Sequence, residues 1–135
     1  MMKKSNGARR FLPVMLLAMA LGLAAVPAYA GSGAIDLSLP PRQENVTVVT
    51  GTKSFTSSTR ASVQLWSDSS FGGIFWVDRD TGNKVTDAVT VNAGNTRYLN
   101  YYAPHTWTAS VQLRGCQIGW NLVGNQHVWG VVDFG

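Results

Sequence analysis

The segment TWTASVQLR, residues 106–114, alternates polar and apolar side chains along its whole length. This period of two is typical of a β-strand that buries one face and exposes the other. The segment RASVQLWS, residues 60–67, repeats the pattern until Trp66 places an apolar ring on the polar face. Both segments predict strands of a sheet with one buried face.

The two segments share the pentapeptide ASVQL, at residues 61–65 and again at 109–113. In a duplicated unit the residues after each copy would also be similar. The segments that follow, WSDSSFGGIFWVD and RGCQIGWNLVGNQ, do not have aromatic residues at matching positions. We interpret the shared pentapeptide as a sequence that suits a half-buried strand and occurs twice for that reason. The copies remain candidates for equivalent strands in two sheets.

The rest of the chain after residue 45 also has strand and turn signals and no convincing helix. β-Branched and aromatic residues dominate, and Gly and Asn mark the turns. GIFWVD, residues 73–78, is apolar on both faces, which favours a central strand. About seven or eight strands at short intervals predict an all-β protein. We expect a small antiparallel β-sandwich, with a small β-barrel as the alternative.

The N-terminus has the pattern of a signal peptide. A basic start is followed by the apolar run from Phe11 to Val26 and by the small residues of PAYA, which predict cleavage after Ala30. The apolar run is shorter than the roughly 20 residues of a membrane span. We therefore expect a secreted, extracellular protein. Residues 1–30 form the signal peptide, residues 31–44 a flexible leader or edge segment, and residues 45–135 the β-sandwich domain.

The basic character of the chain belongs to this targeting segment. The chain has 11 Lys and Arg against 7 Asp and Glu, and Lys3, Lys4, Arg9 and Arg10 lie before the apolar run. The remainder is therefore balanced in charge. Balanced charge does not favour a nucleic-acid partner. It also does not favour strong electrostatic binding to membranes.

Candidate catalytic groups are sparse. A hydrolase triad could combine His105 or His127 with Asp133 and a serine, but the sequence does not show the required geometry. No motif marks a serine nucleophile. A zinc site from the two histidines and Cys116 lacks the close ligand spacing of known sites. Cys116 is the single cysteine, and we expect it to be buried, with an intermolecular disulfide as the alternative. We expect no enzyme activity and no cofactor.

The segment DRDTGN, residues 78–83, offers oxygen atoms to calcium from Asp78, Asp80 and Asn83. No acidic residue closes the loop at the distance that a calcium loop requires. The same residues suit a polar hairpin turn, which is the interpretation we favour.

The aromatic residues are the one sequence feature that indicates a possible binding function. Tryptophan and tyrosine combine a flat apolar ring with a polar atom, which suits contacts with sugars or proteins. Strand alternation predicts that Trp76 and Trp107 belong to the core. The predicted binding residues interrupt polar faces or lie near Gly: Trp66, Tyr101, Trp120 and Trp129.

The order of short segments from Val63 to Phe134 resembles a group of small secreted proteins of Gram-positive bacteria. The segments are IFWVDRDTGNKV, VTVNAGNTRYLNYYA, VQLRG and VWGVVDF. Some members of this group are neighbours or relatives of secreted bacteriocin-type peptides. The resemblance implies a secreted bacterial protein and carries over no catalytic residue.

These observations predict a secreted protein that binds a cell-surface glycan or protein through exposed aromatic residues. The alternative is a bacteriocin-like antimicrobial protein that acts on the envelopes of competitors. A binding module leaves cells unharmed, whereas a toxin inhibits the growth of related strains.

Cleavage after Ala30 is directly testable. Expression with the native N-terminus in a bacterial secretion host should release a protein whose intact mass corresponds to residues 31–135. Ala30→Arg should reduce release, because signal peptidases require a small residue before the cleaved bond. Recovery of the uncleaved chain from the membrane would contradict this prediction.

Overall fold

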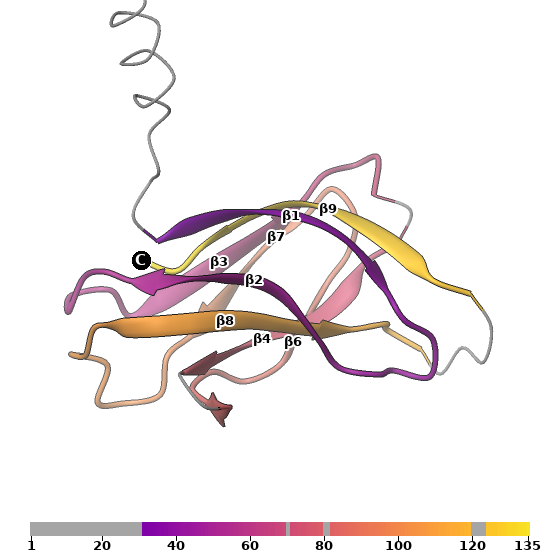
Figure 1. The fold of residues 1–135 in the computed structure, drawn as a ribbon. Coiled ribbons are helices and arrows are strands. Elements are labelled where there is room, and N and C mark those ends of the chain that lie inside the picture. The colour runs from indigo at the N-terminus through magenta and orange to yellow at the C-terminus, as the bar shows by residue number, and fades with distance from the viewer. Residues whose placement is uncertain (1–30, 70, 80–81, 120–123) are drawn as a thin grey trace, which may run out of the picture.

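The computed structural model describes residues 31–69, 71–79, 82–119 and 124–135. These residues form two antiparallel sheets packed face to face, which confirms the predicted β-sandwich (Figure 1). The described part of the chain has no apolar helix of membrane-spanning length.

The first sheet has four strands in the order β1-β9-β3-β7. Their bounds are β1 (Ser32–Leu39), β9 (Gln126–Asp133), β3 (Arg60–Leu65) and β7 (Thr96–Asn100). The second sheet has the order β2-β8-β4-β5, and β6 also pairs with β4. Its bounds are β2 (Val46–Lys53), β8 (Ala109–Cys116), β4 (Gly73–Arg79), β5 (Asn83–Lys84) and β6 (Val89–Val91).

The two ASVQL segments occupy equivalent places in the two sheets. The first lies in β3, between β9 and β7, and the second lies in β8, between β2 and β4. In both copies the Val and Leu side chains are buried, while Ser and Gln lie toward the outer face. The shared sequence therefore reflects a shared environment, a half-buried central strand.

The core lies between the sheets and contains the inward residues of most strands. Its fully buried members include Ile35, Val63, Phe75, Leu113 and Phe134. Burial of such side chains contributes about 1.5–3 kcal/mol each. This apolar layer holds a domain in which the single cysteine forms no disulfide.

β9 packs unusually closely against β3 at Gly130. A Cβ at this position would lie 1.9 Å from the carbonyl oxygen of Gln64, a distance that no side chain tolerates. The close approach lets β9 pair with β1 along its whole length and with β3 at its C-terminal half.

Of the two alternatives for residues 31–44, the structure shows the edge segment rather than the flexible leader for residues 32–39. β1 pairs with β9 in continuous register from Ser32 to Leu39 and is an edge strand of the sandwich. Ile35 and Leu39 are buried and Leu37 packs against the core. The alternation of these three apolar residues drives strand formation, and the flanking Gly and Pro residues obscured it.

The predicted core position of Trp76 is also wrong. Phe75 and Val77 are buried inside the sandwich, so alternation places Trp76 on the outer face of the second sheet, where it is half-buried. The Lys84 Nζ lies 5.7 Å from the centre of its ring. Trp107 packs against the core as predicted, with its ring edge-on to that of Tyr101.

The segment KVTDAVTV does not form one strand. Its first residue, Lys84, ends β5, and its last three residues, Val89–Val91, form β6; both strands pair with β4. At the division, the Thr86 hydroxyl accepts a hydrogen bond from the Val77 amide at 3.0 Å, in place of a backbone partner. A Thr side chain that satisfies the backbone in this way interrupts the strand.

Lys53, at the end of β2, is completely buried. Its ammonium group donates three hydrogen bonds to backbone carbonyls: to Phe55 at 2.6 Å, to His105 at 2.9 Å and to Trp107 at 2.9 Å. It also lies 5.0 Å from the centre of the Trp107 ring. All three ammonium protons are thus satisfied, which makes a buried lysine tolerable. Lys53 joins the β2–β3 connection to the β7–β8 connection.

Tyr101 holds the same end of the sandwich to the C-terminal residues. Its ring is 5% exposed, and its hydroxyl donates a hydrogen bond to the Phe134 carbonyl at 2.7 Å. Burial, together with the negative charge of Asp133, raises the pKa of Tyr101 above its ordinary value.

Lys53→Met should lower the free energy of unfolding by about 3 kcal/mol or more, because three carbonyls lose a buried donor at about 1–3 kcal/mol each. Urea unfolding of the mature protein measures the loss. Lys84→Met is the matched control, since Lys84 is exposed, and it should change stability by less than about 1 kcal/mol. Equal effects of the two substitutions would contradict the role of Lys53.

Comparison of the wild type with Tyr101→Phe should show a difference in the free energy of unfolding that changes at alkaline pH. Below about pH 10 the wild type should be more stable by roughly 1 kcal/mol, the value of the hydrogen bond to Phe134. Above about pH 10, Tyr101 ionises in the unfolded chain and stays protonated in the folded one, so the advantage should fall by up to about 1.4 kcal/mol per pH unit. Urea unfolding of both proteins across this range tests the sign. A constant difference would contradict it.

Candidate binding site on the outer face of the four-stranded sheet

The outer face of the four-stranded sheet carries a mixed aromatic and polar surface. Along β9 the buried residues alternate with outward ones, which are His127, Trp129, Val131 and Asp133. The adjacent strand β3 presents Arg60, Ser62 and Gln64 on the same face, since Ala61, Val63 and Leu65 are buried.

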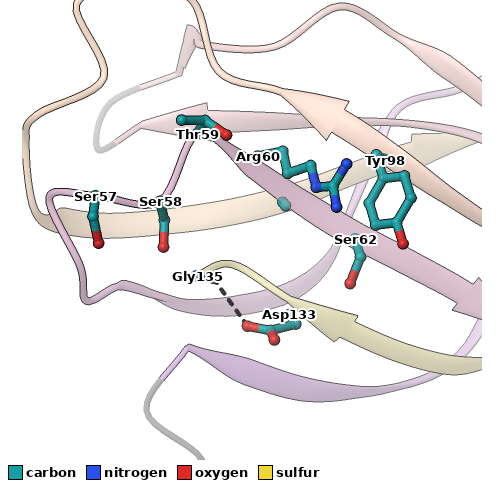
Figure 2. Close-up of a pocket in the computed structure, with 9 residues that line it drawn as sticks. Ser57, Ser58, Thr59, Arg60, Ser62, Tyr98, Asp133 and Gly135 are labelled. Atoms are coloured by element: carbon teal, nitrogen blue, oxygen red, sulfur yellow. Dashed lines mark hydrogen bonds between the residues drawn. The ribbon is translucent and has the colours of Figure 1, made fainter.

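A polar hollow lies at the end of this face where the C-terminal residues run. It has a volume of about 360 Å³, and we call it the Arg60 hollow (Figure 2). Its lining comes from the β2–β3 connection, β3, β7 and the C-terminal residues: Ser57, Ser58, Thr59, Arg60, Ala61, Ser62, Tyr98, Asp133 and Gly135.

Arg60 and Tyr98 form a flat platform at one side of the hollow. The guanidinium carbon lies 3.7 Å from the centre of the Tyr98 ring, which is stacking distance (Figure 2). Tyr98 is 49% exposed and is opposite Ser62 in the register of β3 and β7. The guanidinium and the ring therefore stand on two adjacent strands, β3 and the edge strand β7.

Asp133 lies across from this platform. It is opposite Ser62 in the register of β3 and β9, and its Oδ1 accepts a hydrogen bond from the Gly135 amide at 2.9 Å. A carboxylate has further lone pairs that can accept hydrogen bonds from a ligand. The hollow thus has a cationic side, an anionic side and hydroxyl groups between them.

A second, more apolar hollow adjoins the first. It has a volume of about 620 Å³ and is lined by Ser32, Phe55, Ser58, Val131, Val132, Asp133 and Gly135. We call it the Phe55 hollow. It shares Ser58, Asp133 and Gly135 with the Arg60 hollow. A ligand that spans the two hollows meets polar groups in one and the exposed side chains of Phe55 and Val131 in the other.

The segment that lines both hollows is fixed to the C-terminal residues. The Ser54 amide donates to the Gly135 carbonyl at 2.6 Å, and the Ser58 amide donates to the Phe55 carbonyl at 3.2 Å. Lys53 also donates to the Phe55 carbonyl, and the Tyr101 amide donates to the Thr59 carbonyl at 3.0 Å, so this connection is bonded at both of its ends.

The structure separates the four predicted binding residues. Trp66 is 47% exposed, and its amide donates to the Trp129 carbonyl at 2.9 Å, so these two lie together where β3 ends. The prediction is wrong for Tyr101, which is buried because it lies two residues after the buried Leu99, on the inward face. Trp120 lies outside the described residues.

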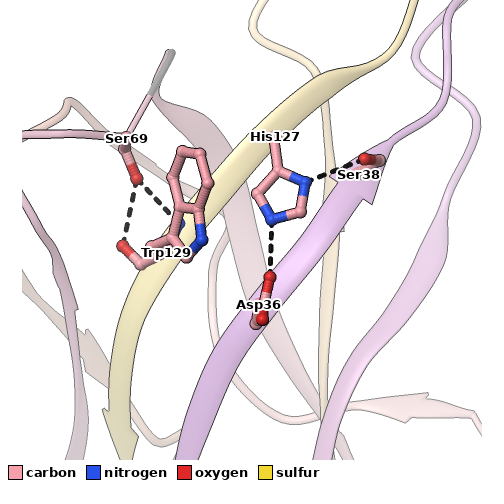
Figure 3. Close-up of polar contacts among 5 residues, drawn as sticks. All are labelled: Asp36, Ser38, Ser69, His127 and Trp129. Atoms are coloured by element: carbon pink, nitrogen blue, oxygen red, sulfur yellow. Dashed lines mark hydrogen bonds and ion pairs between the residues drawn. The ribbon is translucent and has the colours of Figure 1, made fainter.

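Asp133 lies at the opposite end of β9 from His127, so these two residues are not placed for the triad that the sequence analysis considered and did not favour. His127 instead lies between two residues of β1 (Figure 3). Its Nδ1 is 3.0 Å from the Ser38 hydroxyl, and its Nε2 is 2.5 Å from the Asp36 carboxylate. The ring packs against Trp129, with ring centres 4.1 Å apart. This line of polar groups lies on the sheet surface, outside both hollows.

Among the described residues, no three His, Cys, Asp or Glu side chains form a group that could hold a metal ion. Asp78 lies beside Arg114, whose Nε is 3.8 Å from a carboxylate oxygen, and Asp80 lies outside the described residues. Cys116 is buried, as predicted, and its burial raises the pKa of its thiol.

Sequence reasoning missed the residues that line the hollows. The pattern TRYLNYY could have predicted that Tyr98 is exposed, since Leu99 faces inward and the neighbouring residue in a strand faces outward. Arg60 was not available, because no sequence pattern places it against Tyr98 across two strands. The same holds for Asp133, whose role depends on the order of the strands.

No protein-family model, curated protein or solved structure matches this chain. The resemblance to secreted proteins of Gram-positive bacteria therefore stays a prediction. The two hollows on the surface of the sandwich are the basis for the function proposed below.

Proposed function

We propose that this chain is a secreted, non-catalytic binding module that binds a cell-surface or extracellular glycan on the outer face of its four-stranded sheet. The platform of Arg60 and Tyr98, facing Asp133 across a polar hollow, is the observation that carries the proposal.

The chemistry of the hollow matches that of a sugar. One face of a pyranose ring presents C–H groups that pack on an aromatic side chain, and its hydroxyls bond to carboxylate and hydroxyl groups. The Arg60 hollow supplies an exposed tyrosine, an aspartate and several serines within one site. The volumes of both hollows lie within the range of roughly 300–1,000 Å³ that is usual for small-molecule sites.

The exposed aromatic residues farther along the face extend this surface. Trp66 and Trp129 lie beside Val131 on the same sheet, so a chain of sugars that leaves the hollow meets further apolar rings. Rigid aromatic anchors of this kind supply large contact area at low entropic cost. We propose that they form secondary contacts for a longer glycan.

The antimicrobial alternative uses exposed aromatic side chains at two places on the sandwich, of which only Phe55 lines a hollow. Phe55 and Phe71 are more than half exposed, at 58% and 54%, which suits contact with a receptor on a competitor envelope. Growth inhibition of related strains by the purified protein supports this alternative. Binding to cells without inhibition supports the binding module.

Glycan-array screening of the mature protein, followed by calorimetry on the best ligand, tests the proposal. Tyr98→Ala should weaken binding by roughly tenfold or more, because the stacking platform is lost. Tyr102→Ala is the matched control, since Tyr102 is similarly exposed but bonds to Asp87 away from the hollows. The proposal fails if no glycan binds, or if the two substitutions weaken binding equally.

A further inference from the structure

Arg60 is held in place without being neutralised. Its guanidinium stacks on the Tyr98 ring, and among the described residues it forms no ion pair or hydrogen bond with another side chain. Stacking uses the face of the guanidinium and leaves the N–H groups at its edge. The hollow therefore contains a pre-oriented fork of donors.

The acidic residue of the hollow does not use this fork. Asp133 is opposite Ser62 rather than Arg60 in the strand register, and its Oδ1 bonds to the Gly135 amide instead. Opposite charges thus line one hollow at separate positions. A direct ion pair would have closed the site, whereas the separation leaves room for a ligand between the two groups.

We infer that the glycan bound in the Arg60 hollow carries an acidic group, a carboxylate or a sulfate, that binds the edge of the Arg60 guanidinium. This inference rests on the proposed function. The fork geometry of a guanidinium matches two oxygens of an acid group, and such charge-assisted pairs are about twice as strong as neutral hydrogen bonds.

The rest of the hollow then binds the neutral part of the same sugar. Asp133 accepts hydrogen bonds from ring hydroxyls at the far side, which keeps its charge away from the acid group of the ligand. Ser62 lies between Tyr98 and Asp133 in the strand register, and Ser58 also lines the hollow, so both are further partners. The arrangement favours one orientation of an acidic sugar over the reverse, in which the acid group faces Asp133.

The chain offers a matched control in Arg97. It is exposed on β7 next to Tyr98, but it lines neither hollow. Arg60→Gln and Arg97→Gln therefore remove the same charge from the same sheet, and only the first removes it from the hollow. Arg60→Lys keeps the charge and removes the planar fork.

The test uses immobilised oligosaccharides in matched pairs. Uronate oligosaccharides are compared with their methyl esters, and sulfated oligosaccharides with their desulfated forms, which separates the two kinds of acid. We expect the wild type and Arg97→Gln to bind one acidic member at least tenfold more tightly than its neutral partner. Arg60→Gln should bind the two members alike, and Arg60→Lys should lose most of the preference. Thermal unfolding should show that all variants are folded.

Three results would overturn the inference. Equal binding of acidic and neutral partners by the wild type shows that Arg60 only covers Tyr98, and glycan binding itself then stands. A preference that survives Arg60→Gln places the acid group elsewhere. Binding of no oligosaccharide, in these pairs or on the array, removes the proposed function and this inference together.

Discussion

The end of the sandwich that carries the candidate site depends on one buried lysine. Lys53 donates to three carbonyls that belong to two different connections, and no other described side chain joins them in this way. A buried ammonium is stable only when all its protons are bonded, so the three carbonyls are held at fixed positions. One of these carbonyls belongs to Phe55, so the constraint also fixes the start of the segment that lines both hollows.

The candidate site combines rigid and adjustable parts. The platform of Arg60 and Tyr98 and the carboxylate of Asp133 stand on paired strands, which fixes their spacing through the register of the sheet. Phe55 and Ser58 belong to a connection, where the backbone is held by Lys53 and the Gly135 carbonyl but the side chains face solvent. Sites built on strands hold their geometry more closely than sites built on loops.

The fold was predictable because the hydrophobic alternation of each strand is local. ASVQL and QHVWGVVDF reveal their buried faces without knowledge of their partners, whereas GIFWVD is apolar on both faces and led to the wrong assignment of Trp76. The same alternation, followed through TRYLNYY, assigns Tyr101 to the core and Tyr98 to the surface. What no local pattern contains is the order of strands. That order places Arg60 beside Tyr98, brings Asp133 to the same hollow, and leaves the outer face over Trp76 uncovered.

The repeated pentapeptide has a consequence for how the chain reaches this structure. Two identical segments occupy equivalent places in the two sheets, so the pentapeptide itself does not specify which sheet each copy joins. Only flanking contacts distinguish them, such as Arg60 on Tyr98 beside the first copy and Arg114 near Asp78 beside the second. An exchange of the two segments between the sheets is therefore a misfolding route that the pentapeptide leaves open. The trapped species would keep native-like β-structure and lack the native side-chain contacts, so it would escape detection by secondary-structure content alone.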